Sequence, residues 1–265
     1  MKTLTNYSTH TATNTYEATR SVLASKSNNR TGGTAPVVSS FGYSVNPIGQ
    51  RTSVARVASG VTGSTAWGYD GFGQVTSADD SNSSGDRTYQ YDAIGNRKKS
   101  ADSLTLPGSD NYASNALNQY TTIPNVPPTP TYDFDGNATA YPMPAAPAQN
   151  SLLSWDGENR LIYTSVYGTG TIVTYQYDAL GRRIAQNISG TSGSTKATYV
   201  YDGWNCIAEY EGAANTLHAA NLWGLDLSGS FQGAGGVGGL LAVNYPTGLA
   251  LGTYRPLYDG NGNIT

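Results

Sequence analysis

Charged residues are scarce in this sequence, and their scarcity limits what it can bind. Asp, Glu, Lys and Arg make up 12% of the 265 residues, about half the share of an average soluble protein. The formal net charge is -3, and the basic residues are scattered apart from Arg97-Lys98-Lys99. Because a nucleic-acid interface needs a basic patch, we expect no nucleic-acid partner.

The parts of most catalytic and metal sites are missing too. The sequence has two histidines, His10 and His218, one cysteine, Cys206, and no Gly-x-Ser-x-Gly motif, so a hydrolase triad lacks its parts. The Asp-rich segments lack the glycine and glutamate of a calcium loop. The Gly-x-Gly-x-x-Gly pattern at 233–238 lacks the strand and helix that frame a dinucleotide site. We expect no enzymatic activity, no cofactor and no metal.

Long apolar runs are also absent. The first ten residues contain no apolar stretch of the kind that a secretory signal has. No part of the chain approaches the roughly 18 consecutive apolar residues of a membrane helix. We therefore expect no membrane span.

Residues that favour strands and turns are abundant instead. The chain contains 20 Tyr, 4 Trp and 32 Gly but only 2 Met. Aromatic and β-branched residues favour pleated surfaces, whereas Gly, Asn, Ser and Asp favour turns. This composition predicts an all-β protein.

The stretch from Thr174 to Tyr210 shows how these residues are arranged. Tyr175 and Tyr177 alternate with polar neighbours, and a second strand-like run follows Asp178-Ala179-Leu180-Gly181, which predicts a β-hairpin. The Asp178 carboxylate can accept the backbone N–H two residues on. Gly181 can adopt the left-handed conformation that closes the loop.

The same signature recurs about every 20 residues, which predicts a tandem array of antiparallel hairpins forming a curved or spiralling sheet. An aromatic or apolar residue precedes Asp or Asn at Val45-Asn46, Tyr69-Asp70, Tyr91-Asp92, Leu117-Asn118, Phe134-Asp135, Trp155-Asp156, Tyr177-Asp178, Tyr201-Asp202 and Tyr258-Asp259. The predicted structural turn residues are Asn46, Gly49, Asp70, Gly73, Asp92, Gly95, Asp135, Asp156, Asp178, Gly181, Asp202 and Asp259.

Composition divides the chain into three parts. Residues 1–36 are predicted to be an irregular or incomplete leading repeat, and residues 37–221 the hairpin array. Seven of the twelve prolines lie between Pro124 and Pro147, so we expect extended connectors at 123–149, because proline cannot donate to a ladder. Residues 222–265 are predicted to be a Gly-rich segment and a truncated final repeat, whose unpaired strand indicates a longer parent protein.

The segments 91–97, 155–161 and 177–183 resemble the YD-repeat, or Rhs-repeat, family, and the resemblance covers about residues 37–265. It implies a long β-strip that forms a hollow shell, as in bacterial polymorphic toxins, insecticidal toxin complexes and teneurins. In the bacterial proteins the shell encloses a C-terminal toxic domain. The copies at Asp135 and Asp202 lack the closing glycine. No Asp-Pro motif of the associated autoprotease occurs, so autoproteolysis does not carry over.

Two functions follow as hypotheses. The first is a non-enzymatic shell segment of a large secreted or cell-surface protein, with a C-terminal effector of the parent chain as its partner. The alternative is an adhesion module that binds glycans or a surface protein through exposed aromatic rows. The candidate binding aromatics are Trp67, Tyr69, Trp155, Tyr175, Tyr177, Tyr199 and Tyr201.

Overall fold

The computed structural model describes residues 2–4, 10–30, 37–58, 60–124, 129–143, 146–166, 168–191 and 193–265. Within these ranges the protein is all-β, as predicted, and the one helical element is a single 3-10 turn, η1 (Ser83–Gly85). No helix in this part of the chain is long and apolar enough to cross a membrane. Neighbouring strands of every sheet are also neighbours in the sequence and run antiparallel.

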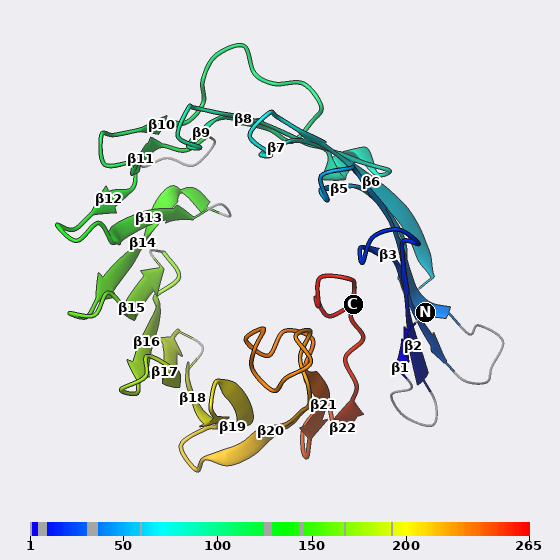
Figure 1. Ribbon diagram of the computed structural model, residues 1–265. Coiled ribbons are helices and arrows are strands. Elements are labelled where there is room, and N and C mark those ends of the chain that lie inside the picture. Colours follow the sequence, from blue (N-terminus) through cyan, green and yellow to red (C-terminus); the bar gives the residue numbers. More distant parts are fainter. Residues whose placement is uncertain are drawn as a thin grey trace. The chain divides into compact units, whose positions relative to one another are not determined.

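The chain divides into two units. The first consists of residues 1–110 together with 256–265, and its strands form a nine-stranded sheet. Figure 1 shows these strands in chain order. They are β1 (Lys2–Leu4), β2 (His10–Tyr16), β3 (Leu23–Arg30), β4 (Val37–Val45), β5 (Arg51–Ala58), β6 (Val61–Tyr69), β7 (Val75–Asp80), β8 (Arg87–Tyr91) and β9 (Arg97–Ala101).

The second unit spans residues 111–255 and contains a two-stranded and an eleven-stranded sheet. The small sheet pairs β10 (Ala113–Ser114) with β11 (Tyr120–Thr122). The large sheet contains β12 (Thr131–Tyr132), β13 (Ala138–Met143), β14 (Ala146–Trp155), β15 (Leu161–Val166), β16 (Thr171–Tyr177), β17 (Arg183–Gly190), β18 (Gly193–Asp202), β19 (Asn205–Glu211), β20 (Thr216–Trp223), β21 (Leu240–Tyr245) and β22 (Gly252–Tyr254).

A register shift accompanies the Asp and Asn turns. The shift falls at Gly68/Tyr69 between β6 and β7 and at Gln176/Tyr177 between β16 and β17. Such a bulge beside a turn with a left-handed residue increases the twist and fixes the pairing. The turns therefore set the register of the array.

The predicted connector at 123–149 is corrected by the structure. Residues 125–128 and 144–145 of it lie outside the described residues, but β13 and the start of β14 pass through the rest. Pro142 pairs with Asn150 next to a register shift at Pro142/Met143. At an irregular point of the ladder the missing proline N–H is tolerated.

The predicted boundaries at 36 and 221 differ from the structure as well. A hairpin of β2 and β3 already precedes residue 37, paired from His10–Arg30 to Tyr16–Leu23. After residue 221, β21 and β22 extend the large sheet. Polar Thr, Ser and Asn strands without the Tyr-Asp signature gave no periodic signal in the leading region.

Among the residues that the structure describes, the apolar core is small. The buried apolar side chains are Phe41, Val54, Ala140, Ala185, Ala219 and Ala242, and buried polar side chains such as Asn28, Ser39 and Thr65 lie among the same sheets. A ribbon with so little apolar burial depends on its backbone ladder and on contacts between neighbouring hairpins.

Candidate functional site

The turn at Asp178 shows the local chemistry. We number each such turn from its first Asp or Asn, so that Gly181 is position 4 and Arg182 position 5. The Asp178 Oδ1 accepts the backbone N–H groups of Leu180 (2.9 Å) and Arg182 (3.0 Å). Gly181 has φ +79° and donates its N–H to the Asp178 carbonyl at 3.0 Å. One carboxylate thus satisfies two backbone donors that a tight loop would leave unpaired.

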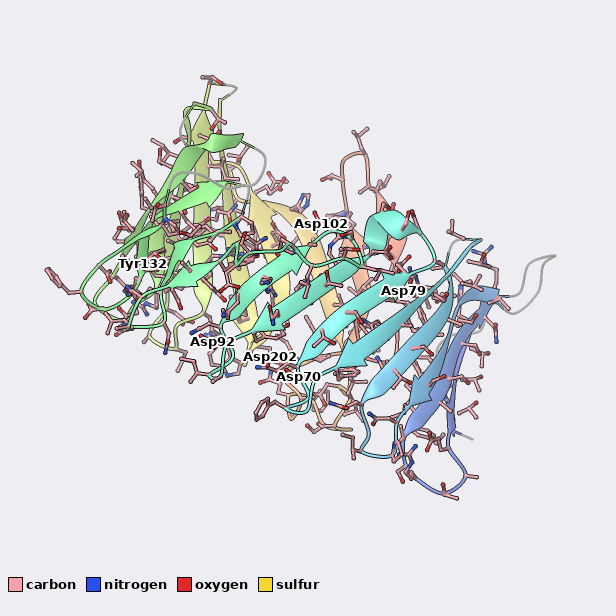
Figure 2. All side chains as sticks on the ribbon, turned by 90° about the horizontal axis from the view of Figure 1, so that it is seen from above. Asp70, Asp79, Asp92, Asp102, Tyr132 and Asp202 are labelled. Atoms are coloured by element: carbon pink, nitrogen blue, oxygen red, sulfur yellow. The ribbon has the colours of Figure 1, made fainter. Side chains whose placement is uncertain are left out.

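The same turn recurs along both units. Asp70 and Asp92 lie at one end of the strands of the first sheet, whereas Asp79 and Asp102 lie toward the opposite end (Figure 2). In each copy the side-chain oxygen at position 1 accepts the N–H of position 5. The residues at position 1 are Asn46, Asp70, Asp92, Asn115, Asp133, Asp156, Asp178 and Asp259.

Two predicted turns begin at a different residue. Asp133, and not Asp135, occupies position 1, because its Oδ1 accepts the N–H groups of Asp135 and Asn137. Gly136 is then the closing residue, with φ +89°. In the preceding copy the turn begins at Asn115, and Asn118 lies at position 4 with φ +62°. Asparagine tolerates this left-handed conformation better than most residues.

Asp202 belongs to another kind of turn. It is the last residue of β18 and pairs with Asn205, so Gly203 and Trp204 form a two-residue loop. Gly203 has φ +56°. The Asp202 carbonyl accepts a hydrogen bond from Gln232 Nε2 at 3.0 Å. The Gly-rich segment therefore covers this turn, in place of a side-chain cap.

Position 5 links one turn to the next. Arg160 Nε donates to Asp156 Oδ2 at 2.8 Å, and Arg160 Nη1 donates to the Asp178 carbonyl at 3.2 Å. Arg182 repeats this arrangement with Asp178 and the Gly203 carbonyl. Partial desolvation opposes ionisation of the Asp178 carboxyl, but hydrogen bonds from Arg182 and Leu180 outweigh it and lower the pKa of Asp178.

At many of the turns an aromatic residue at the end of the strand reaches back to the preceding hairpin. Tyr177 Oη donates to the Leu161 carbonyl at 2.7 Å, and Leu161 is position 6 of the turn that begins at Asp156. The same bond joins Tyr69 to Arg51, Tyr91 to Val75, Tyr132 to Tyr120, Trp155 to Ala138, Tyr201 to Arg183 and Trp223 to Cys206. These bonds form what we call the aromatic ladder.

The ladder changes the interpretation of the predicted binding aromatics. The sequence predicts exposed rows, but Trp67, Tyr69, Trp155, Tyr175, Tyr177, Tyr199 and Tyr201 are all half-buried. In four of them the polar atom already bonds to a neighbouring hairpin. The rings of Tyr175 and Tyr199 flank the Arg183 guanidinium, at 5.6 and 5.3 Å from its Cζ. The four bonded side chains join neighbouring hairpins, because a side chain directly before a turn points onto the preceding hairpin.

Several of the most exposed apolar residues lie at the turn tips. Position 3 of the three Asx turns between β4 and β9 carries Ile48, Phe72 and Ile94, which are 79%, 88% and 71% exposed. Position 3 lies two residues after the capping Asp or Asn. The sequence signal was an apolar residue inside an otherwise polar turn.

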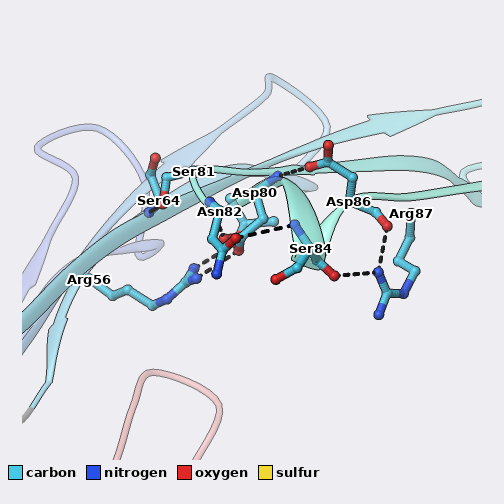
Figure 3. A network of polar contacts seen from close by, with 9 residues as sticks. Arg56, Ser64, Asp80, Ser81, Asn82, Ser84, Asp86 and Arg87 are labelled. Carbon is cyan, nitrogen blue, oxygen red and sulfur yellow. Dashed lines mark hydrogen bonds and ion pairs between the residues drawn. The ribbon is translucent and has the colours of Figure 1, made fainter. Parts of the chain in front are cut away.

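A compact polar network lies at the other end of these strands, around Asp80 at the end of β7 (Figure 3). Thr65 Oγ1 donates to Asp80 Oδ2 at 2.6 Å, and Arg56 Nη2 donates to the same oxygen at 2.7 Å. The Asn82 N–H donates to Asp80 Oδ1, and the buried Asp86 accepts the Asp80 N–H at 3.0 Å. The bond from Thr65, together with those from Asn82 and Arg56, lowers the pKa of Asp80 to about 2.

The Gly-rich segment is ordered around Asp226, a residue that sequence reasoning missed. Asp226 is buried, and its Oδ1 accepts the Ser228 hydroxyl at 2.5 Å. Its Oδ2 accepts the N–H groups of Ala234 (2.6 Å) and Gly236 (3.2 Å). The Ser228 bond contributes most to lowering the pKa of Asp226 to about 2, against partial desolvation. A carboxylate that caps several loop N–H groups has a structural role.

The carboxylates described above are each occupied by turn or ladder groups. Among the described residues no three His, Cys, Asp or Glu side chains come together as a metal site would require. The arrangement is a series of capped turns, many of which are hydrogen-bonded to a neighbouring hairpin.

Comparison with known proteins gives a distant similarity. No protein-family model matches the chain. It is 28% identical over 194 residues to a protein named tRNA nuclease WapA from Bacillus subtilis (strain 168), and 28% identical over 193 residues to the tRNA3(Ser)-specific nuclease WapA of Bacillus spizizenii. Each alignment covers 67% of this chain but only 8% of the relative. The chain is thus similar to a small segment of two long proteins named as nucleases.

Proposed function

We propose that this chain is a non-enzymatic structural segment of a larger YD-repeat protein, secreted or at the cell surface, and that it helps to enclose a C-terminal effector of the parent. The observation that carries the proposal is the aromatic ladder. Four of its donors are predicted binding aromatics, and their polar atoms are bonded to backbone carbonyls of the preceding hairpin. Because each hairpin makes this contact only with its neighbour, further hairpins can be added to the ribbon by the same contact.

The distant similarity supports the same proposal. Because the alignments cover 8% of the two nucleases, the matched segment leaves nine tenths of those proteins for other functions, including cleavage of RNA. The basic residues of this chain are scattered in the sequence. The carboxylates that cap the described turns are already bonded to backbone N–H groups. A scaffold role therefore accounts for the similarity without a catalytic site.

A direct test is to incubate the purified chain with tRNA and follow the RNA on a denaturing gel. We expect intact tRNA at micromolar protein over hours, with an active ribonuclease as the positive control. Cleavage that co-purifies with the folded chain and disappears in an Asp80→Asn or Glu209→Gln variant would overturn the proposal, because it would locate a nuclease within these residues.

A second candidate, a glycan- or protein-binding module, is favoured by one observation. An open cavity of about 110 Å³ lies on β17–β19, lined by Gln186, Lys196, Tyr199, Glu209 and Glu211 among others. An aromatic ring beside several polar groups suits a sugar. Glycan-array binding that is lost in Tyr199→Ala and kept in Tyr175→Ala would support this candidate, whereas no binding by the native chain would remove it.

A further inference from the structure

The last residues of the chain contact a sheet that is far away in sequence. We call Tyr258–Thr265 the terminal turn; it begins at Asp259 and closes at Gly262 with φ +83°. Its red trace lies beside β3 in Figure 1. The Gly260 N–H donates to Tyr43 Oη at 2.7 Å, and Asn28 Nδ2 donates to the Tyr258 carbonyl at 3.1 Å. These bonds span 217 and 230 residues of sequence.

The contact is tight at a glycine. A Cβ on Gly260 would lie 2.7 Å from both Leu23 Cδ2 and Tyr43 Oη. Gly71 and Gly157 occupy the same turn position in other repeats, and a Cβ on either would meet nothing within 4 Å. Of these three turns, only the terminal turn has no room for a side chain larger than glycine at this position.

The surface that receives the turn is polar and buried. Asn28 and Ser39 are each 2% exposed, and Asn28 Nδ2 also donates to Ser39 Oγ at 2.8 Å. Buried amides and hydroxyls cost free energy unless they are hydrogen-bonded. The terminal turn supplies the Tyr258 carbonyl to Asn28 and places Thr265 Oγ1 at 3.4 Å from Ser39 Oγ. These polar groups thus fit a segment that brings hydrogen-bonding groups of its own.

Side chains around the edge of this surface add selectivity. Arg51 Nη1 donates to Asn261 Oδ1 at 2.8 Å, at the position where other turns carry Phe72 or Glu158. The Lys26 ammonium lies 5.8 Å from the centre of the Tyr258 ring, a distance that suits a cation–π contact. Burial lowers the pKa of Lys26, and the nearby Asp259 carboxylate opposes that shift.

We propose that the face of β3–β5 is a docking site for one Asp-Gly-Asn turn, and that the chain's own terminal turn occupies it. The chain leaves the first unit at residue 110 and returns to it at residue 256. Docking therefore fixes the returning segment on the sheet of the first unit. This role lies beyond the ladder contacts between neighbouring hairpins.

A disulfide tests the docking. In a Cys206→Ser background, Ser39→Cys and Thr265→Cys place two thiols where hydroxyl oxygens lie 3.4 Å apart. We expect mild oxidation to produce an intramolecular disulfide in the monomer, seen by non-reducing gel mobility and by intact mass. Adding Gly260→Val should reduce the rate of disulfide formation at least tenfold, whereas Gly71→Val, its matched control, should change the rate less than twofold.

The outcomes separate clearly, provided that circular dichroism first shows every variant to be folded. A monomeric disulfide that depends on Gly260 supports the proposal. Three results would overturn it: no disulfide in the parent pair, a disulfide that is indifferent to Gly260→Val, or only intermolecular disulfides. The last would mean that the turn docks on a second copy of the chain.

Discussion

Removing a single hydroxyl from the aromatic ladder should destabilise the ribbon measurably. Tyr177→Phe keeps the ring and deletes the donor to the Leu161 carbonyl, which it contacts at 2.7 Å. Burial raises the pKa of Tyr177, as expected for a phenol withdrawn from water. The carbonyl would therefore lose its side-chain partner in a place that water reaches poorly.

The size of the effect follows from hydrogen-bond energetics. A hydrogen bond contributes about 0.5–1.5 kcal/mol net, and a stranded buried acceptor raises the cost to between about 1 and 3 kcal/mol. Because Tyr177 is only half-buried, we expect a loss of about 1 to 2 kcal/mol in the free energy of unfolding. For a cooperative unit of about 150 residues each kcal/mol lowers Tm by roughly 2–4 °C.

The assay is urea unfolding followed by tyrosine fluorescence, together with thermal melts by circular dichroism. The matched control is Tyr175→Phe, two residues earlier in β16, since the described residues provide no hydrogen bond for that hydroxyl, although its ring contacts Arg183. The control should change stability by less than about 0.5 kcal/mol. Equal effects of the two substitutions would refute the claim that the ladder bond stabilises the fold.

Three further predictions concern the turns and the acidic groups. Gly181→Val forces a branched residue to φ +79° and should cost about 1–2 kcal/mol in urea unfolding, whereas Gly157→Val, at a turn position without positive φ and with open space, should cost less. Because the folded pKa of Asp80 is about 2, below the ordinary value, its ionised form stabilises the protein above about pH 4, and this contribution is lost as pH falls toward 2. Asp80→Asn should flatten the acid limb of a stability–pH curve; an unchanged slope between pH 4 and 2 would contradict the network in Figure 3. Asp226→Asn should leave the strands intact in circular dichroism and speed amide exchange at Ala234 and Gly236, and unchanged protection there would argue against the carboxylate cap.

The turn chemistry was predictable because it is local. Asp178 and Gly181 are three residues apart, and their roles follow from φ preferences and from the reach of a short carboxylate. The same rule misplaced two turns, at Asn118 and at Asp135. In the second case Tyr132-Asp133 and Phe134-Asp135 both match the aromatic–Asp pattern. Gly136 decides between them, because it is three residues after Asp133 and so provides the left-handed corner.

What sequence patterns could not supply were the partners across hairpins. Tyr177 was predicted to be an exposed ring, and only the pairing of β15 with β16 brings its hydroxyl to Leu161. The Asp226 cap, likewise, depends on the path of a Gly-rich segment that has no periodic signal. The contact of Gly260 with Tyr43 joins residues 217 positions apart, and no local rule reaches that far.

The direction of the aromatic ladder bears on how the chain is made. Every donor in it bonds to a carbonyl that lies earlier in the sequence, 12 to 18 residues back. During synthesis the acceptor has therefore already left the ribosome when its donor emerges, so each hairpin can be completed on a finished neighbour. The ladder can therefore form in chain order, whereas the bond between Gly260 and Tyr43 joins residues 217 positions apart and cannot form until residue 260 has been made.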